Sequence, residues 1–303
     1  MKDNQYMIDN YKIIAEKFKD ENNLKKALYF YKKAYNLSKN NKDIELLIDM
    51  GLIYDEMGDY DLAREKYHEV LEIDPQNSAA HYGIAIAYDN EKEYAKAIEY
   101  YKKTIDLDPE YDRAYFFLAN IYDEIGNKKK AIEYYNKLIN MDDEDFWAYV
   151  NLSCIYEEMD ENILALDLIE EALNIGPNHY KALFNKAIIL RKLGDIDGAI
   201  EYYKLSIKEN PNYPYSYFNL AIIYKEEGNY EKSLETLTEG INYNDDIAVL
   251  YYNRACLYAL MNELEKARDD LILSIKLDSD LKEYMMTDKE LKSVIDLIDI
   301  DKL

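Results

Sequence analysis

Hydrophobic residues between positions 44 and 77 recur at the spacing of an α-helix, in two runs that are separated by a turn signal. In the first run Leu47 and Tyr54 fall on one face, because an α-helix makes a turn about every 3.6 residues. Gly58 then breaks the pattern, and glycine readily adopts the left-handed conformation that ends a helix. The second run stops at Pro75, whose ring cannot continue a helix. The segment is therefore predicted to be a hairpin of two helices.

The same hairpin pattern recurs along the chain at a constant interval. A small residue marks the second helix of each copy, and after one interval of 36 residues every further interval is 34 residues. These small residues are Ala27, Ala63, Ala97, Ala131, Ala165, Ala199, Ser233 and Ala267. The predicted repeats start at Ile8, Ile44, Ser78, Asp112, Phe146, Tyr180, Pro214 and Ala248. This series predicts an all-α repeat protein in which each hairpin packs on its neighbours.

The residues that recur in these hairpins match a known signature. They are Leu47-x-x-Met50-Gly51-x-x-Tyr54, then Ala63-x-x-x-Tyr67, then Pro75. This pattern resembles the tetratricopeptide repeat, and the resemblance covers nearly the whole chain. It implies a right-handed α-solenoid, a superhelix of eight helix-turn-helix repeats with a capping helix at the C-terminal end. It also implies that the chain binds other proteins.

We expect one continuous solenoid in three parts. Residues 1–43 form a degenerate N-terminal repeat, in which Asn22 and Asn23 stand where a turn glycine is usual. Residues 44–281 form seven contiguous repeats of 34 residues, and residues 282–303 form a capping helix. Thr287 and Glu290 have the spacing of a capping box that starts this last helix. Its inward apolar residues are then Leu291, Val294, Ile295 and Ile298.

The composition excludes several classes of partner. A formal net charge of −24 and a pI near 4.5 argue against nucleic acids and anionic membranes, because these are bound mainly by clustered Lys and Arg. The first residues do not form a signal peptide and no apolar run is long enough to span a bilayer, so we expect a cytoplasmic protein. Cys154 and Cys256 occupy the same position three repeats apart, too far for a disulfide, and should be reduced.

Residues that would carry catalysis are not grouped in the sequence. His68, His81 and His179 fall at different positions of different repeats, which gives no metal-ligand spacing. The glycines are scattered and form no phosphate-binding loop. Paired carboxylates such as Asp55 and Glu56 are adjacent on a helix and point about 100° apart. The sequence therefore predicts no enzyme, no cofactor and no metal site.

The resemblance implies that the first helix of each repeat lines a concave groove. One groove position carries asparagine in four successive repeats, at Asn151, Asn185, Asn219 and Asn253. A carboxamide both donates and accepts hydrogen bonds, so such a row can pair with the backbone of an extended peptide. Alternatively, each asparagine bonds within its own repeat. The sequence leaves both interpretations open.

Aromatic residues accompany this row. They are Tyr82, Phe116, Phe184, Phe218 and Tyr252, at one repeat position that precedes the asparagine position. They predict an apolar strip in the groove, although core packing explains part of it. The chain also contains 33 tyrosines, which suit a fold two helices thick because tyrosine can bury its ring and keep its hydroxyl in water.

Charge along the groove is predicted to change sign. The acidic residues at groove positions of repeats two to five are Asp55, Glu56, Asp89, Asp123, Glu124, Glu157 and Glu158, and the basic residues at groove positions of repeats six and seven are Lys181, Arg191, Lys192 and Lys225. One interpretation is a partner peptide that is acidic over repeats six and seven and basic over repeats two to five. The other is that the cations neutralise neighbours such as Glu226 and Glu158.

The sequence as a whole predicts a non-enzymatic scaffold or adaptor that binds an extended peptide or a partner protein in the groove. Two alternatives remain: a regulatory receptor for a short peptide, and a targeting subunit of an enzyme complex whose output is supplied by another protein. Self-association through the solenoid ends or the groove is compatible with each of them. The identity of the partner is not encoded in any recognisable motif.

Overall fold

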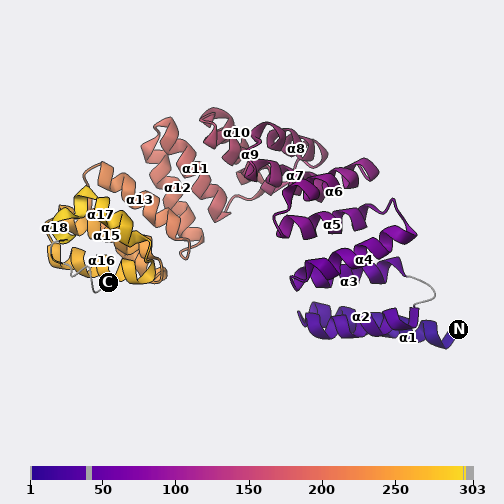
Figure 1. Cartoon of the computed structure of the whole chain (residues 1–303). Coiled ribbons are helices and arrows are strands. Elements are labelled where there is room, and N and C mark those ends of the chain that lie inside the picture. The colour runs from indigo at the N-terminus through magenta and orange to yellow at the C-terminus, as the bar shows by residue number, and fades with distance from the viewer. Residues whose placement is uncertain (1, 39–42, 296, 298–303) are drawn as a thin grey trace. The chain divides into compact units, whose positions relative to one another are not determined.

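The computed structural model describes residues 2–38, 43–295 and 297 (Figure 1). Within these residues the regular elements are helices, and no strand is present. The first eight helices are α1 (Lys2–Asp20), α2 (Leu24–Ser38), α3 (Ile44–Glu56), α4 (Tyr60–Ile73), α5 (Ser78–Asn90), α6 (Tyr94–Leu107), α7 (Asp112–Glu124) and α8 (Lys128–Met141). The others are α9 (Phe146–Glu158), α10 (Asn162–Ile175), α11 (Tyr180–Leu193), α12 (Ile196–Glu209), α13 (Pro214–Glu226), α14 (Tyr230–Tyr243), α15 (Ala248–Leu260), α16 (Leu264–Leu277), α17 (Leu281–Thr287), the 3-10 turn η1 (Lys289–Leu291) and α18 (Lys292–Ile295).

The chain divides into two compact units, Met1–Ala148 and Tyr149–Leu303, with the boundary inside α9. In each unit, successive helices pair into antiparallel hairpins, such as α3 with α4 and α11 with α12. The second helix of a hairpin also packs on the first helix of the next hairpin, as α4 does on α5. The predicted all-α solenoid of two-helix repeats is therefore confirmed.

The helix boundaries follow local sequence signals. From α3 to α15, each first helix begins at the residue where the 34-residue period places the start of a repeat. Only α1 begins earlier than the period indicates, at Lys2 instead of Ile8, because the preceding residues contain no glycine or proline to break it.

The turn inside each hairpin places one residue in the left-handed region. Gly58 does so with a φ of 79°, as predicted. The other residues with this conformation are Gly126, Gly194, Gly228, Asn22, Lys92, Asp160 and Asn262. Asparagine and aspartate tolerate positive φ better than most residues, which explains the turns at Asn22, Asp160 and Asn262, whereas Lys92 adopts this conformation at a cost.

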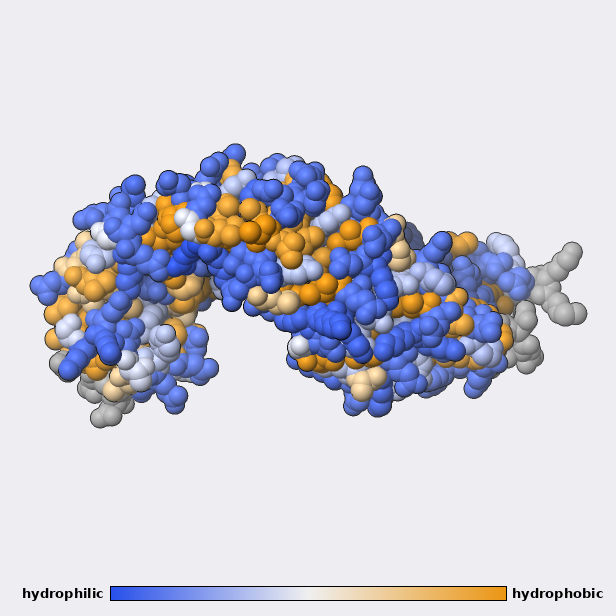
Figure 2. Space-filling view, turned by 90° about the horizontal axis from the view of Figure 1, so that it is seen from above, coloured by the Kyte–Doolittle hydropathy of each residue, from blue (hydrophilic) through white to orange (hydrophobic). Residues whose placement is uncertain are grey.

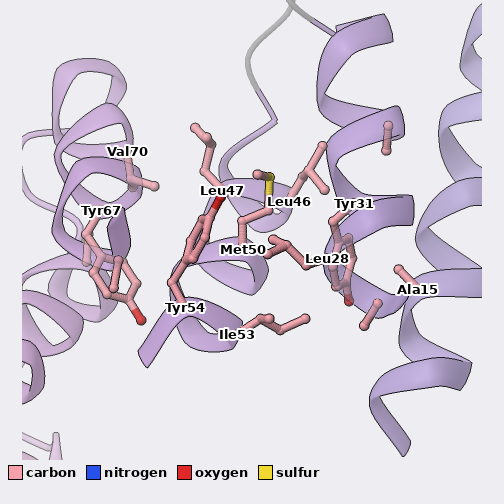
Figure 3. Close-up of a cluster of buried hydrophobic side chains, with 14 of the residues drawn as sticks. Ala15, Leu28, Tyr31, Leu46, Leu47, Met50, Ile53, Tyr54, Tyr67 and Val70 are labelled. Atoms are coloured by element: carbon pink, nitrogen blue, oxygen red, sulfur yellow. The ribbon is translucent and has the colours of Figure 1, made fainter. Parts of the chain in front are cut away.

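The core lies between the helices of each hairpin and its neighbours. Figure 3 shows that α3 has two buried sides, one toward α2 and one toward α4. Leu46, Met50 and Ile53 face α2, where Leu28 and Tyr31 lie, and Leu47 and Tyr54 face α4. All seven side chains are buried, so each first helix joins two hairpins into one core.

The C-terminal tail differs from its prediction. The capping box is wrong, because Thr287 ends α17 and its hydroxyl donates to the backbone carbonyl of Tyr284 at 2.9 Å. Asp288 is the N-cap instead, and its carboxylate accepts the Glu290 backbone N–H at 2.9 Å. Aspartate is at least as good an N-cap as threonine, and it stands one residue closer to the new turn.

The apolar residues of the tail contact the last hairpin as expected. Leu291 and Val294 are fully buried against residues of α15 and α16, and Ile295 packs beside them. Ile298 lies outside the described residues. In the part of the chain that the structure describes, no helix is both long enough and apolar enough to cross a membrane. The face shown in Figure 2 is mainly hydrophilic, with smaller hydrophobic patches.

Candidate peptide-binding surface

The candidate surface is the first-helix face, which we define as the exposed side of the first helices: α3, α5, α7 and the start of α9 in the first unit, and α11, α13 and α15 in the second. Each unit is described by itself. The side chains on this face are held by residues of the second helices that reach between the first helices.

Tyr67 of α4 is the clearest example of this support. Its ring is fully buried between two glycines, Gly51 of α3 and Gly83 of α5. A Cβ atom on Gly83 would lie within 2.6 Å of three ring atoms, and one on Gly51 within 3.0 Å of three. Only residues without a side chain leave room for the ring, so the two glycines determine where the Tyr67 hydroxyl lies.

The Tyr67 hydroxyl reaches a carboxylate of the first-helix face. It donates to Asp55 Oδ2 at 2.7 Å, and in the next repeat the Tyr101 hydroxyl donates to Asp89 Oδ2 at 3.2 Å. These tyrosines are fully buried, so their hydroxyls bond to carboxylates and are not kept in water as the sequence suggested. The sequence reasoning missed the pairs, although a spacing of 12 residues within each pair, repeated one period later, is a signal for them.

Burial changes the protonation of these acids. It raises the pKa of Asp55 to about 6, although the hydrogen bond from Tyr67 acts in the opposite direction. Burial also raises the pKa of Asp89. The second oxygen of Asp55, Oδ1, is buried without a hydrogen-bond partner among the described residues. The acidic first-helix face thus contains carboxylates that are only partly solvated.

Two hollows lie side by side on the face of the first unit. One has a volume of about 450 Å³ and is lined by Asp55, Tyr67 and other residues of α3 and α5. The second has a volume of about 400 Å³ and is lined by Phe116 and by Trp147 at the start of α9. Tyr82 and Arg113 line both hollows, so the two hollows adjoin, and we refer to them together as the depression.

The predicted aromatic residues of the first unit belong to this depression. Tyr82 is half-buried, and its ring centre lies 4.8 Å from that of Tyr111 and 6.3 Å from that of Phe117. Phe116 is also half-buried and lies edge-on to Phe117, with 5.5 Å between ring centres. The depression therefore has an aromatic floor of rings that hold one another in place.

The predicted aromatic residues of the second unit are more deeply placed. Phe184 is 9% exposed and packs against Tyr203 and Tyr213, with ring centres 5.7 and 5.2 Å away. Tyr252 is 5% exposed, and its hydroxyl donates to Asp288 Oδ2 at 2.8 Å. Phe218 is half-buried. Core packing thus accounts for two of these three residues.

Two of the predicted cations of the second unit pair with carboxylates of neighbouring repeats. Arg191 Nη2 lies 2.7 Å from Glu226 Oε2, as the neutralisation interpretation predicts. Lys192 Nζ lies 2.7 Å from Glu157 Oε1, where that interpretation named Glu158.

The other two predicted cations differ from each other. Lys225 Nζ lies 2.6 Å from Oε2 of Glu290, a tail residue that neither interpretation anticipated. Lys181 is exposed on α11.

Comparison with known sequences decides the family. Models of the tetratricopeptide repeat match residues 48–112, 90–152, 180–213, 202–235 and 248–281, which together make up more than half of the chain. The chain belongs to the tetratricopeptide repeat family. A search of curated proteins gave no match.

Solved structures share the tetratricopeptide repeat fold with this chain. The MamA protein is 26% identical, with 56% of this chain and 92% of that chain covered and a TM-score of 0.51. A tetratricopeptide repeat protein from Parabacteroides merdae ATCC 43184 is 19% identical, covers 86% and 99% and has a TM-score of 0.62. YrrB, described as a TPR protein with an unusual peptide-binding site, is 22% identical, covers 59% and 93% and has a TM-score of 0.50.

The asparagine row of the tetratricopeptide repeats lies in the second unit. The side-chain amides of Asn219 and Asn253 donate to the backbone carbonyls of Tyr215 and Val249, four residues earlier in the same helix, at 2.9 and 2.8 Å. These bonds use one donor of each amide.

The other two asparagines of the row differ from this pattern. Asn185 Nδ2 lies 3.1 Å from Cys154 Sγ. Asn151 is half-buried on α9.

Histidines and cysteines of these tetratricopeptide repeats have structural environments. His81 Nε2 lies 3.1 Å from the carbonyl oxygen of Pro75, and burial lowers the pKa of this histidine. Cys154 and Cys256 are both free thiols. Over residues 2–38, 43–295 and 297, no three His, Cys, Asp or Glu side chains are grouped so that they could hold a metal ion.

Proposed function

We propose that this tetratricopeptide repeat protein is a non-enzymatic scaffold or adaptor, which binds an extended segment of a partner protein along its first-helix face. The observation that carries the proposal is the depression of the first unit, in which two adjoining hollows share Tyr82 and Arg113. It extends over α3, α5, α7 and the start of α9, so a segment lying in it contacts successive repeats.

The size and lining of the depression suit side chains of a peptide. Each hollow falls within the range of about 300 to 1,000 Å³ that is usual for ligand sites. Aromatic residues such as Trp147 and Phe116 offer large rigid contact surfaces, which are typical of residues that dominate binding energy. The solved structure of YrrB shows that this fold can carry a peptide-binding site.

The charges of the depression favour a partner segment with basic residues. Asp55 and Glu56 line the first hollow, and Asp112 and Asp145 line the second. Arg113 is the one cation among the described residues that line either hollow. A Lys or Arg of the partner that enters the first hollow brings its charge beside Asp55, whose buried Oδ1 has no hydrogen-bond partner there.

Fluorescence of Trp147 provides a direct test, because it is the single tryptophan of the chain and lines the second hollow. Random peptides displayed on phage are selected on the immobilised full-length protein, and the selected peptides are then synthesised. We expect them to shift the tryptophan emission, excited where tyrosine does not absorb, in a saturable manner.

Two alanine variants test the position of the site. We expect Phe116→Ala to weaken binding of the selected peptides about tenfold or more, because truncating a central aromatic contact costs at least ~1.4 kcal/mol. The matched control is Tyr243→Ala, which removes an aromatic side chain that is 54% exposed on the second helix α14. Peptides that bind both variants equally well, or that leave the emission unchanged, would refute this site.

A further inference from the structure

The first helices α13 and α15 of the second unit line a further hollow, and the chain's own tail lies in part of it. The hollow has a volume of about 500 Å³, and four of the predicted peptide-binding residues line it: Phe218, Lys225, Tyr252 and Asn253. Three tail residues, Tyr284, Asp288 and Glu290, line it as well. The tail thus meets the surface that the sequence assigned to a peptide.

The contacts of the tail use two carboxylates that are two residues apart. Asp288 Oδ2 accepts a hydrogen bond from the Tyr252 hydroxyl at 2.8 Å and lies 3.9 Å from Cys256 Sγ. Glu290 Oε2 lies 2.6 Å from the Lys225 ammonium nitrogen. Tyr252 and Lys225 belong to successive first helices, α15 and α13, so the tail bridges two repeats.

The repeat period explains why Lys225 pairs with the tail. Its counterpart one period earlier, Arg191, pairs with Glu226 on the following first helix. Glu226 follows Arg191 by 35 residues, and the residue at this spacing after Lys225 is Leu260, which carries no charge. Among the described residues, the carboxylate that pairs with Lys225 therefore comes from the tail, where Glu290 lies 65 residues further along the chain.

We infer that this surface is a binding site for an acidic partner segment, and that Asp288 to Leu291 is an internal stand-in for that segment. This inference rests on the proposed peptide-binding function. The contacts of the tail define the chemistry that the site recognises: an acid that accepts from the Tyr252 hydroxyl, a second acid two residues later at Lys225, and an aliphatic residue directly after it, as Leu291 is here.

A partner segment of this kind competes with the tail. Leu291 is fully buried, so a segment with acids alone would not replace its apolar contacts. The hollow beside the tail is also lined by Val249 and Asn253 of α15, so a partner segment has room there for residues that extend beyond the acidic pair. The tail consequently makes binding selective, because only a segment with both features displaces it.

The test uses the full-length chain and a fluorescently labelled synthetic peptide with the sequence of residues 284–295. In the variant Asp288→Asn/Glu290→Gln the tail loses both charges, while asparagine still serves as the N-cap of the turn. We expect this variant to bind the peptide about tenfold more tightly than the wild type, because the competing internal segment is weakened. Adding Lys225→Glu should abolish that gain.

Two matched controls identify the cause. Glu283→Gln removes an exposed acid of α17 and should leave peptide affinity at the wild-type value. A peptide with Asn and Gln in place of its two acids should not bind the Asp288→Asn/Glu290→Gln variant. Equal affinity of that variant and the wild type, or equal binding of the neutral peptide, would overturn the inference.

A second measurement needs no variant. In the wild-type chain, an excess of the acidic peptide should speed hydrogen exchange of the backbone amides of residues 288–295, since the displaced tail loses its protection. If saturating peptide left the exchange rates of residues 288–295 unchanged, displacement of the tail would be contradicted. This measurement uses only the wild-type chain, so it stands even where the Asp288→Asn/Glu290→Gln variant does not fold. Selected library peptides that shift Trp147 while the tail peptide binds nowhere would refute this inference and leave the proposed function intact.

Discussion

Replacing Gly83 by alanine is expected to destabilise the first unit, although alanine is the better helix former. Gly83 lies within helix α5, where alanine is favoured over glycine by about 1 kcal/mol. The new methyl group, however, would lie within 2.6 Å of three atoms of the Tyr67 ring. The sign of the effect depends on whether that ring can move.

The structure indicates that it cannot move far. To restore an ordinary contact of 3.4 Å the ring would have to shift by about 1 Å, toward Gly51 and α3, where it is already in close contact. Overpacking in a closed core costs about 1 to 3 kcal/mol, and we take the upper end because both sides of the ring are occupied. Subtracting the gain in helix propensity leaves a loss of about 2 kcal/mol.

Urea denaturation followed by circular dichroism measures the loss, and hydrogen exchange of α4 and α5 shows where it occurs. The control is the pair of variants Tyr67→Leu and Gly83→Ala/Tyr67→Leu, because leucine occupies the same repeat position, fully buried, at Leu237 and Leu271. If the clash is the cause, the two changes should couple by at least ~1 kcal/mol, so that the double variant is more stable than the sum predicts. A Gly83→Ala protein as stable as the wild type would refute the reasoning.

Three further changes have expected outcomes. Asp55→Asn should raise the free energy of unfolding relative to the wild type by about 1 kcal/mol at pH 7, with little gain at pH 4. The reason is the raised pKa of Asp55, because of which the wild type loses stability as the pH rises from 3.8 through about 6. A stability difference between variant and wild type that does not depend on pH would contradict this. Lys92→Gly should stabilise by about 1 kcal/mol in thermal denaturation, since lysine there has a φ of 60°; an unchanged melting temperature would argue against strain at this turn. If the amides pair with a peptide backbone, the double change Asn185→Ala/Asn219→Ala should weaken binding of peptides that contact the second unit by about tenfold, with little change in melting temperature. A lower melting temperature with unchanged peptide affinity would instead assign these asparagines a structural role.

Local signals explain how much of the fold could be predicted. The start of each first helix from Ile44 to Ala248, and the left-handed turn at Gly58, depend on residues within one or two helical turns. Such signals act wherever the segment lies, and the constant period repeats them. The tail shows the limit of this reasoning, because Thr287 and Asp288 are adjacent candidates for one N-cap, and in the structure Asp288 takes this role while Thr287 ends α17.

The candidate site was predicted less completely, for a physical reason. The sequence indicated which residues belong to the first-helix face, and Tyr82 and Phe116 do line the depression. It did not indicate that Phe184 is buried, because burial depends on how far a neighbouring helix covers the position.

What the sequence by itself determined is the period and the helices of the repeats, since these follow from residue type and short-range spacing. Only the tertiary structure decided the partners of the side chains. Tyr67 reaches Asp55 because two glycines of different helices leave room for its ring, and Lys225 meets Glu290 because the tail folds back over two repeats. A partner across an interface depends on the packing of helices that are distant in sequence, and no short-range pattern specifies that packing.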